Sequence, residues 1–127
     1  MTSFECLTPT HVLIVEDDAL VQLELAAWMT ELGLMPTTAD NADEALKLLN
    51  SGAPIEILLT DVEMPGSMNG VALAKRVAEH WPPIKIVVLS GASATELSDL
   101  PQGSAFVAKP FDHSKLWQAL SRSSARH

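Results

Sequence analysis

The stretch His11-Val-Leu-Ile-Val15 is a continuous apolar run that stops at three acidic residues, Glu16-Asp17-Asp18. An uninterrupted run of this length is typical of a strand whose two faces are both covered. It is followed by residues 19–32, in which apolar residues recur at helical spacing until Gly33 ends the pattern. A buried strand that leads into an amphipathic helix is the unit from which α/β domains are built.

The same alternation continues to the end of the chain. Short apolar runs predict further strands at residues 34–38, 55–60, 84–89 and 105–108. Helical patterns lie at residues 41–49 and 70–80, and Asp112 is expected to cap a last helix. Because crossovers between parallel strands are right-handed, the pattern predicts an α/β fold with a doubly wound, five-stranded parallel sheet and helices on both faces.

The composition describes one globular domain. The chain has 127 residues, of which 47% are hydrophobic and 19% charged, and this excludes global disorder. Sixteen acidic residues against eight basic ones give a net charge of −8, which repels phosphate backbones and argues against nucleic-acid binding. The single cysteine, Cys6, suits a reducing compartment. No signal peptide and no run of about 18 apolar residues is present, so we expect a cytoplasmic protein without a membrane partner.

Polar residues follow four of the predicted strands at the point where each strand ends. Glu16-Asp17-Asp18 follow the first strand, and Asp61, Ser90 and Lys109 follow the third, fourth and fifth. Ligands of such sheets bind beyond the carboxyl ends of the strands, so these side chains are expected to converge. Gathered carboxylates repel one another unless a cation compensates, and hard oxygen ligands favour Mg²⁺. Neither Cys nor His stands at these strand ends, which argues against zinc.

The loop after the first predicted strand carries no glycine-rich phosphate-binding pattern. This removes nucleotide-driven enzymes from consideration. What is left is a carboxylate nucleophile beside Mg²⁺, with a cation and a hydroxyl available to receive a phosphoryl group.

Four motifs, taken together, resemble the receiver domain of two-component response regulators. They are Val15-Glu16-Asp17-Asp18, Leu59-Thr60-Asp61-Val-Glu-Met-Pro65, Val88-Leu89-Ser90-Gly91-Ala92 and Ala108-Lys109-Pro110-Phe111. They occur in the family's order within residues 11–121. The resemblance implies the flavodoxin-like strand order 2-1-3-4-5. It also implies a tail at residues 1–10, a receiver domain at residues 11–121 and a second tail at residues 122–127.

The resemblance further implies a role for each residue of the acidic edge. Asp61 would be the phosphoacceptor, its carboxylate attacking a phosphohistidine on a histidine kinase or histidine phosphotransferase. Asp17 and Asp61 would bind Mg²⁺ directly with the backbone carbonyl of Glu63, and Glu16 would act through water. Asp18 is expected to begin the first helix instead, where a negative charge suits the helix dipole.

The remaining motif residues would bind the phosphoryl group and report its presence. Ser90 would donate a hydrogen bond to one phosphoryl oxygen, and Lys109 would pair with another. Phe106 matches an aromatic switch position and would swing inward as Ser90 moves. The Lys109–Pro110 peptide bond would be cis and would aim the ammonium into the pocket.

The sequence departs from the family pattern in three places. The loop at residues 64–70 is one residue longer than is common, and Phe106 lacks the hydroxyl of the frequent tyrosine. Only residues 91–104 separate the fourth and fifth predicted strands, close to the minimum of about 10 to 12 residues for a crossover. A fourth helix there is limited to about two turns, at residues 95–100. A helix that short is marginal alone, so we predict that this segment is mobile and orders on phosphorylation or partner binding.

The sequence is thus identified as a stand-alone receiver that signals to a downstream protein target through protein contacts. It would catalyse its own phosphorylation and dephosphorylation, with no external turnover expected. Three alternatives remain: a receiver from a hybrid kinase or larger regulator, a pseudo-receiver that only binds, and a metal-dependent phosphohydrolase. Aspartyl phosphatases usually carry D-x-D after the first strand, whereas acidic residues are adjacent here. Trp117 is either an ordinary exposed residue or an anchor for a partner.

Overall fold

The computed structural model describes residues 10–62, 68–91, 100–109 and 112–125. The strands are β1 (His11–Val15), β2 (Met35–Ala39), β3 (Ile57–Asp61), β4 (Lys85–Ser90) and β5 (Ala105–Ala108). The helices are α1 (Ala19–Glu31), α2 (Ala42–Asn50), α3 (Gly70–His80) and α5 (His113–Ala125). The predicted fourth helix lies almost wholly outside the described residues, and so does the prediction of its mobility.

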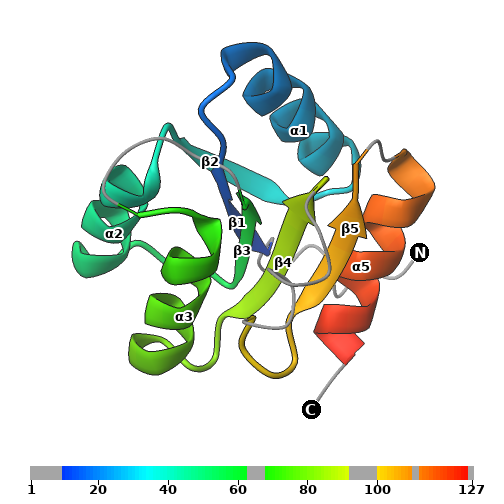
Figure 1. Ribbon diagram of the computed structural model, residues 1–127. Helices are drawn as coiled ribbons and strands as arrows, with labels where there is room; N and C mark the ends of the chain where they lie inside the picture. Colours follow the sequence, from blue (N-terminus) through cyan, green and yellow to red (C-terminus); the bar gives the residue numbers. More distant parts are fainter. Residues whose placement is uncertain (1–9, 63–67, 92–99, 110–111, 126–127) are drawn as a thin grey trace.

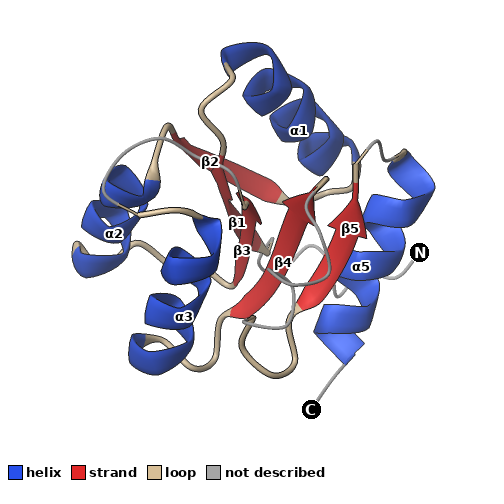
Figure 2. Cartoon of the chain, in the orientation of Figure 1, coloured by secondary structure: helices blue, strands red, loops and turns tan. Residues whose placement is uncertain are grey.

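The strands form one parallel sheet in the order β2-β1-β3-β4-β5, as predicted. Helices α2 and α3 cover one face of this sheet, and α1 and α5 cover the other (Figure 1). Figure 2 shows the sheet as the central layer between these helix pairs. The α/β, doubly wound architecture predicted from the sequence is therefore confirmed.

The three central strands, β1, β3 and β4, send alternate side chains into two separate cores. Leu13 and Leu58 pack with α2 and α3, whereas Ile14 and Leu59 pack with α1 and α5. All five residues of β3 are buried. Burial on both faces explains why the strands are uninterrupted apolar runs in the sequence.

Local signals set the helix starts. Asp18 caps α1 by accepting hydrogen bonds from the amides of Leu20 and Val21. Asn41 and Asn69 cap α2 and α3 in the same way. Asp112 accepts from the Lys115 amide at 2.9 Å, which confirms the predicted cap of the last helix. Short polar side chains at these positions satisfy amides that the first helical turn leaves without partners.

Three strands end one residue later than the sequence predicts: β2 ends at Ala39 instead of Thr38, and the other two end at residues of the predicted site. The third strand was expected to end at Thr60 and the fourth at Leu89, but β3 includes Asp61 and β4 includes Ser90. Asp61 pairs in register with Leu89, and Ser90 with Ala108. The neighbouring strand continues the ladder through these polar residues, so Asp61 and Ser90 both lie on regular strand backbone.

None of the helices in the described part of the chain has the length and the apolar character that a membrane-spanning helix needs.

Candidate functional site

Three carboxylates meet where β1 and β3 end. Ligand oxygens of Glu16, Asp17 and Asp61 all lie within 4.8 Å of one another. Glu16 and Asp61 are buried, whereas Asp17 is exposed. Asp18 is engaged as the cap of α1, so it does not join this group. The acidic cluster expected from the strand ends is therefore present, with Asp17 as its solvent-facing member.

Lys109 supplies the positive charge of the site. Its Nζ donates to Oδ2 of Asp61 at 2.7 Å, a distance typical of a charge-assisted hydrogen bond. The backbone amide of Lys109 donates to the Ser90 carbonyl at 3.0 Å, which continues the β4–β5 ladder one residue further. The side chain is 35% exposed while that of Asp61 is 7% exposed, so the lysine reaches from the rim of the site to a buried acid.

Ser90 belongs to the same edge of the sheet. It is the last residue of β4 and is 1% exposed. Its neighbour Leu89 pairs with Asp61 in the β3–β4 ladder, so Ser90 lies one residue beyond that pair. The hydroxyl, the ammonium and the carboxylates that the sequence singled out thus come from adjacent strands of one edge.

The carboxylate of Glu16 has a buried environment that fits a cation. Its Oε2 accepts from the Asp18 amide at 3.0 Å, while its buried Oε1 receives no hydrogen bond from any described residue. Burial raises the pKa of Glu16 to about 7, against the Asp18 hydrogen bond and the Lys109 charge, which lower it. The charge of Asp61 and a hydrogen bond between the Asp61 side chain and the protonated Glu16 also raise this pKa. An unsatisfied buried oxygen among clustered carboxylates fits a hard divalent cation such as Mg²⁺.

Three other predicted positions are less fully described. Glu63 and Pro110 lie outside the described residues, and with them the predicted carbonyl ligand and the cis peptide bond. Phe106 lies on β5 opposite Val88 and is 40% exposed. Its ring therefore faces solvent in this conformation.

Gly70 is a contributor to the site that the sequence analysis treated only as a helix start. Its amide donates to the Val62 carbonyl at 2.8 Å, and a Cβ at this position would clash with the carbonyl of Asp61. The first turn of α3 can approach the end of β3 this closely only because residue 70 has no side chain. The signal for this contact in the sequence is a glycine as the first residue of a strong helical pattern, because glycine is an unfavourable helix residue.

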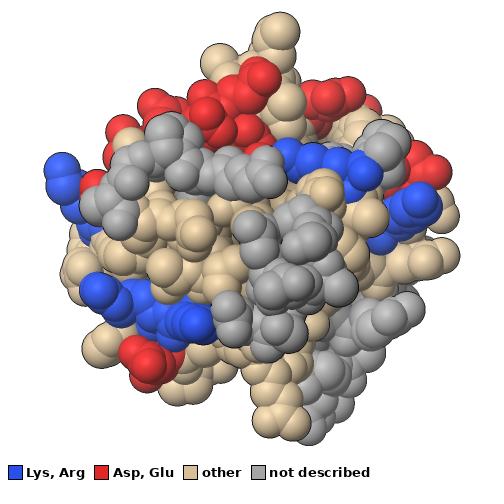
Figure 3. All heavy atoms as spheres, in the orientation of Figure 1, with Lys and Arg blue, Asp and Glu red and all other residues tan. Residues whose placement is uncertain are grey.

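The charge on the surface is unevenly distributed. Figure 3 shows acidic side chains gathered at the top of the face drawn, on the side where α1 lies, while basic side chains are spread around its flanks. The face drawn is therefore more negative at its top than at its flanks. Such a field attracts divalent cations and basic partner surfaces.

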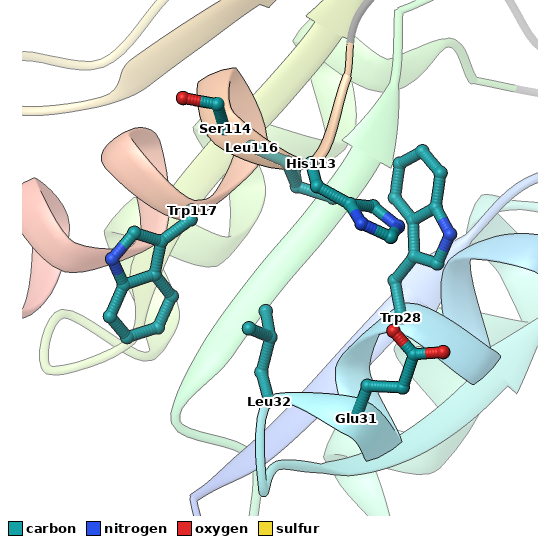
Figure 4. Close-up of a pocket in the computed structure, with 7 residues that line it drawn as sticks. All are labelled: Trp28, Glu31, Leu32, His113, Ser114, Leu116 and Trp117. Atoms are coloured by element: carbon teal, nitrogen blue, oxygen red, sulfur yellow. The ribbon is translucent and has the colours of Figure 1, made fainter.

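Apart from the acidic cluster, the surface has a hollow between the end of α1 and the start of α5 (Figure 4). It measures about 320 Å³ and is lined by Trp28, Glu31, Leu32, His113, Ser114, Leu116 and Trp117. The rings of Trp28 and His113 meet edge to face with centroids 3.8 Å apart, and Trp117 faces them from the opposite wall. This hollow shares no residue with the acidic cluster, and Glu31 is the one carboxylate among the described residues that line it. It therefore does not offer the grouped carboxylates that the sequence predicts for the strand ends.

Comparison with known families finds a match over most of the chain. The family model of the response regulator receiver domain matches residues 12–121. The response regulator receiver protein CpdR of Brucella abortus is 35% identical over 104 residues, which make up 80% of this chain and 85% of CpdR. The DNA-binding transcriptional regulator NtrC of Klebsiella pneumoniae is 33% identical over 102 residues, or 78% of this chain. This chain spans about a fifth of the length of NtrC.

Solved structures agree with the family match. A response regulator receiver protein from Sinorhizobium medicae has a TM-score of 0.87 at 29% identity, covering 95% of this chain and 99% of that one. TrrA of Thermotoga maritima, crystallised in complex with Mg²⁺ and BeF, has a TM-score of 0.78 at 25% identity, covering 90% of this chain and 98% of TrrA. The similarity therefore extends over a whole domain and is not confined to one motif.

Proposed function

This chain belongs to the response regulator receiver family, and we propose that it accepts a phosphoryl group on Asp61 from a histidine kinase or histidine phosphotransferase and signals through protein contacts. The observation that carries the proposal is the pairing of a buried Asp61 with Lys109 at 2.7 Å inside a cluster of three carboxylates. A lone acid at a strand end has structural explanations, but this combination matches what phosphoryl transfer to a carboxylate requires.

In the proposed reaction a carboxylate oxygen of Asp61 attacks phosphorus. The new O–P bond forms as the P–N bond to the donor imidazole breaks, and the imidazole nitrogen keeps the electron pair and takes up a proton. The Lys109 ammonium, already beside Asp61, then pairs with a phosphoryl oxygen of the product. Its fixed backbone bond to Ser90 limits the reorganisation that this change of partner needs.

Mg²⁺ would be held by Asp17 and Asp61 with the Glu63 carbonyl, and by Glu16 through water. When bound, this ion supplies positive charge that offsets the charge on the transferring group. The complex of TrrA with Mg²⁺ and BeF supports this assignment, as does the buried Glu16 Oε1 without a hydrogen-bond donor among the described residues.

The response to phosphorylation is proposed to run through Ser90 and Phe106. The Ser90 hydroxyl would turn toward a phosphoryl oxygen, and Phe106, exposed in this conformation, would move into the space left behind. A new dianion at the edge of the sheet would in this way change a surface that a downstream protein reads. The chemistry is the same whether residues 12–121 act alone or within a longer protein.

The test is the intact mass of the protein after incubation with acetyl phosphate and Mg²⁺. We expect a gain of one phosphoryl group that Asp61→Asn abolishes. Asp18→Asn is the matched control, because it removes the same charge beside the site while Asn remains a good helix cap.

The alternatives give different results in the same experiment. No mass gain, together with no binding of beryllofluoride, would mean a pseudo-receiver and would overturn the proposal. Steady hydrolysis of a small phosphate ester that depends on Asp17 or Asp61 would instead indicate a metal-dependent phosphohydrolase.

A further inference from the structure

Gln22 is a partly buried residue of α1 whose side-chain amide reaches three oxygen atoms from other segments. Its Nε2 donates to the Glu16 carbonyl at 2.9 Å, to Oδ1 of Asp40 at 3.0 Å and to the Ala39 carbonyl at 3.3 Å. A primary amide has only two N–H groups, so the two shorter bonds account for both and the third contact is shared. Gln22 therefore joins α1 to the segments that follow β1 and β2.

The Glu16 carbonyl belongs to the peptide group that links Glu16 to Asp17. Its orientation sets the direction in which both acidic side chains leave the backbone. The Glu16 amide is held separately, because it donates to the Ala39 carbonyl at 3.1 Å. Gln22 thus supplies the bond on the carbonyl side of Glu16, directly at the start of the acidic cluster.

Asp40, the second partner of Gln22, is itself fixed by α2. Its amide donates to Oε1 of Glu44 at 2.8 Å, and the Glu44 amide donates to Oδ1 of the cap residue Asn41 at 2.9 Å. The first turn of α2 therefore holds the backbone of Asp40, whose carboxylate receives one bond from Gln22. The chain of contacts runs from α2 through Gln22 to the peptide between two acidic residues of the site.

We propose that Gln22 is a positioning residue of the acidic site, holding the Glu16–Asp17 peptide so that both carboxylates meet Asp61 in the arrangement that binds Mg²⁺. The inference deepens the proposed function and rests on it. Gln22 acts through Glu16 and Asp40, and three oxygens converge on its amide, so the position requires a side chain with several N–H donors. Arginine meets that requirement, leucine supplies no donor, and glutamate would add a fourth acceptor.

The test compares Gln22→Leu with the wild-type chain in two measurements. Calorimetric titration is expected to show Mg²⁺ affinity about 10-fold weaker, the lower end of the loss seen when a residue that orients a metal ligand is removed. The Asp18 amide, which donates to the Glu16 carboxylate, is expected to exchange with solvent faster in Mg²⁺-free protein. Gln22→Arg should restore both properties, and Gln118→Leu, at an exposed position of α5, should change neither.

Mg²⁺ affinity and Asp18 exchange equal to wild type in Gln22→Leu would overturn the inference, even if the variant were less stable, because a purely structural role predicts that result. Should Gln22→Leu fail to fold, Gln22→Met, which keeps the length of the side chain and removes both N–H donors, is measured in its place, and an unchanged Mg²⁺ affinity would again overturn the inference. Failure of the proposed function is distinct: the wild-type chain would itself take up neither a phosphoryl group nor beryllofluoride.

Discussion

At the scale of one residue, Gly70 allows α3 to pack closely against the end of β3. A methyl group here would press on the backbone carbonyl of Asp61, so one of the two segments must move. We expect Gly70→Ala to lower the free energy of unfolding by about 1–3 kcal/mol, as overpacking does, and to slow phosphorylation by acetyl phosphate. Urea denaturation and the rate of mass gain measure the two effects.

Gly91→Ala is the control for the stability measurement. A Cβ on Gly91 meets no atom of the described residues within 4 Å, and its φ is not positive, so this variant should unfold like the wild type. Equal stability of the two variants would contradict the close approach of α3 to Asp61.

Glu16 predicts a pH dependence of stability. Its pKa in the folded protein is raised to about 7, so between pH 4.5 and 7 the folded state binds a proton that the unfolded state has lost. Stability from this group is therefore complete below pH 4.5 and falls as the pH rises through 7. The loss is at most about 3–4 kcal/mol, because the pKa rises from 4.5 to about 7 and each pKa unit corresponds to about 1.4 kcal/mol.

The measurement is urea denaturation in EDTA at pH 5 and pH 8, for the wild type and Glu16→Gln. The variant should lose less stability than the wild type over this range, because its residue 16 does not titrate. Mg²⁺ should reduce the difference, since the cation favours the ionised carboxylate. Identical pH profiles of stability for the wild type and Glu16→Gln would show that Glu16 does not cause the pH dependence.

At the scale of one element, α1 leaves large apolar side chains beside the site. Leu20 is 78% exposed and Leu23 is 68% exposed, and both follow the acidic cluster by a few residues. In the proposed phosphoryl transfer a donor histidine must come within bonding distance of Asp61, so the donor's surface has to cover neighbouring parts of the molecule. Exposed leucines at this place are suited to contact with that partner.

We expect Leu20→Ser/Leu23→Ser to slow phosphoryl transfer from a phosphorylated histidine-phosphotransfer protein by at least about 10-fold, the effect of losing about 1.4 kcal/mol of contact energy. Phosphorylation by acetyl phosphate, which needs no docking, should be unchanged. Met35→Ser is the control, because this exposed residue begins β2 at the amino-terminal end of the strands, away from the acidic cluster. Equal slowing with both donors would show that the substitutions disturb the site itself.

At the scale of the whole molecule, an acidic cluster in a chain of net charge −8 makes stability depend on cations. A ligand that binds only the folded state at ten times its Kd stabilises by about 1.4 kcal/mol. Mg²⁺ should therefore raise the urea midpoint, and EDTA should reverse the change. NaCl at matched ionic strength separates this effect from general screening, and Asp17→Asn should abolish it. A Mg²⁺-dependent rise in the urea midpoint that persists in Asp17→Asn would show that the cation binds at another site.

The sequence alone determined the class of fold and the place of the acidic cluster. Uninterrupted apolar strands report burial on two faces, and caps such as Asp18 and Asp112 report helix starts, because these signals act between residues close in the chain. The parallel strands then bring Glu16, Asp17 and Asp61 to one edge without further information.

Only the tertiary structure decided how that edge is built. The Lys109–Asp61 bond spans 48 positions in the sequence, and the Gln22–Asp40 bond spans 18. The buried Glu16 oxygen, and the clash that a side chain at Gly70 would cause, likewise depend on segments meeting across the sheet. Sequence patterns report which residues are buried and where elements begin. The partner of a polar atom is set by the register and packing of distant segments, and this is why these contacts could not be predicted from the chain alone.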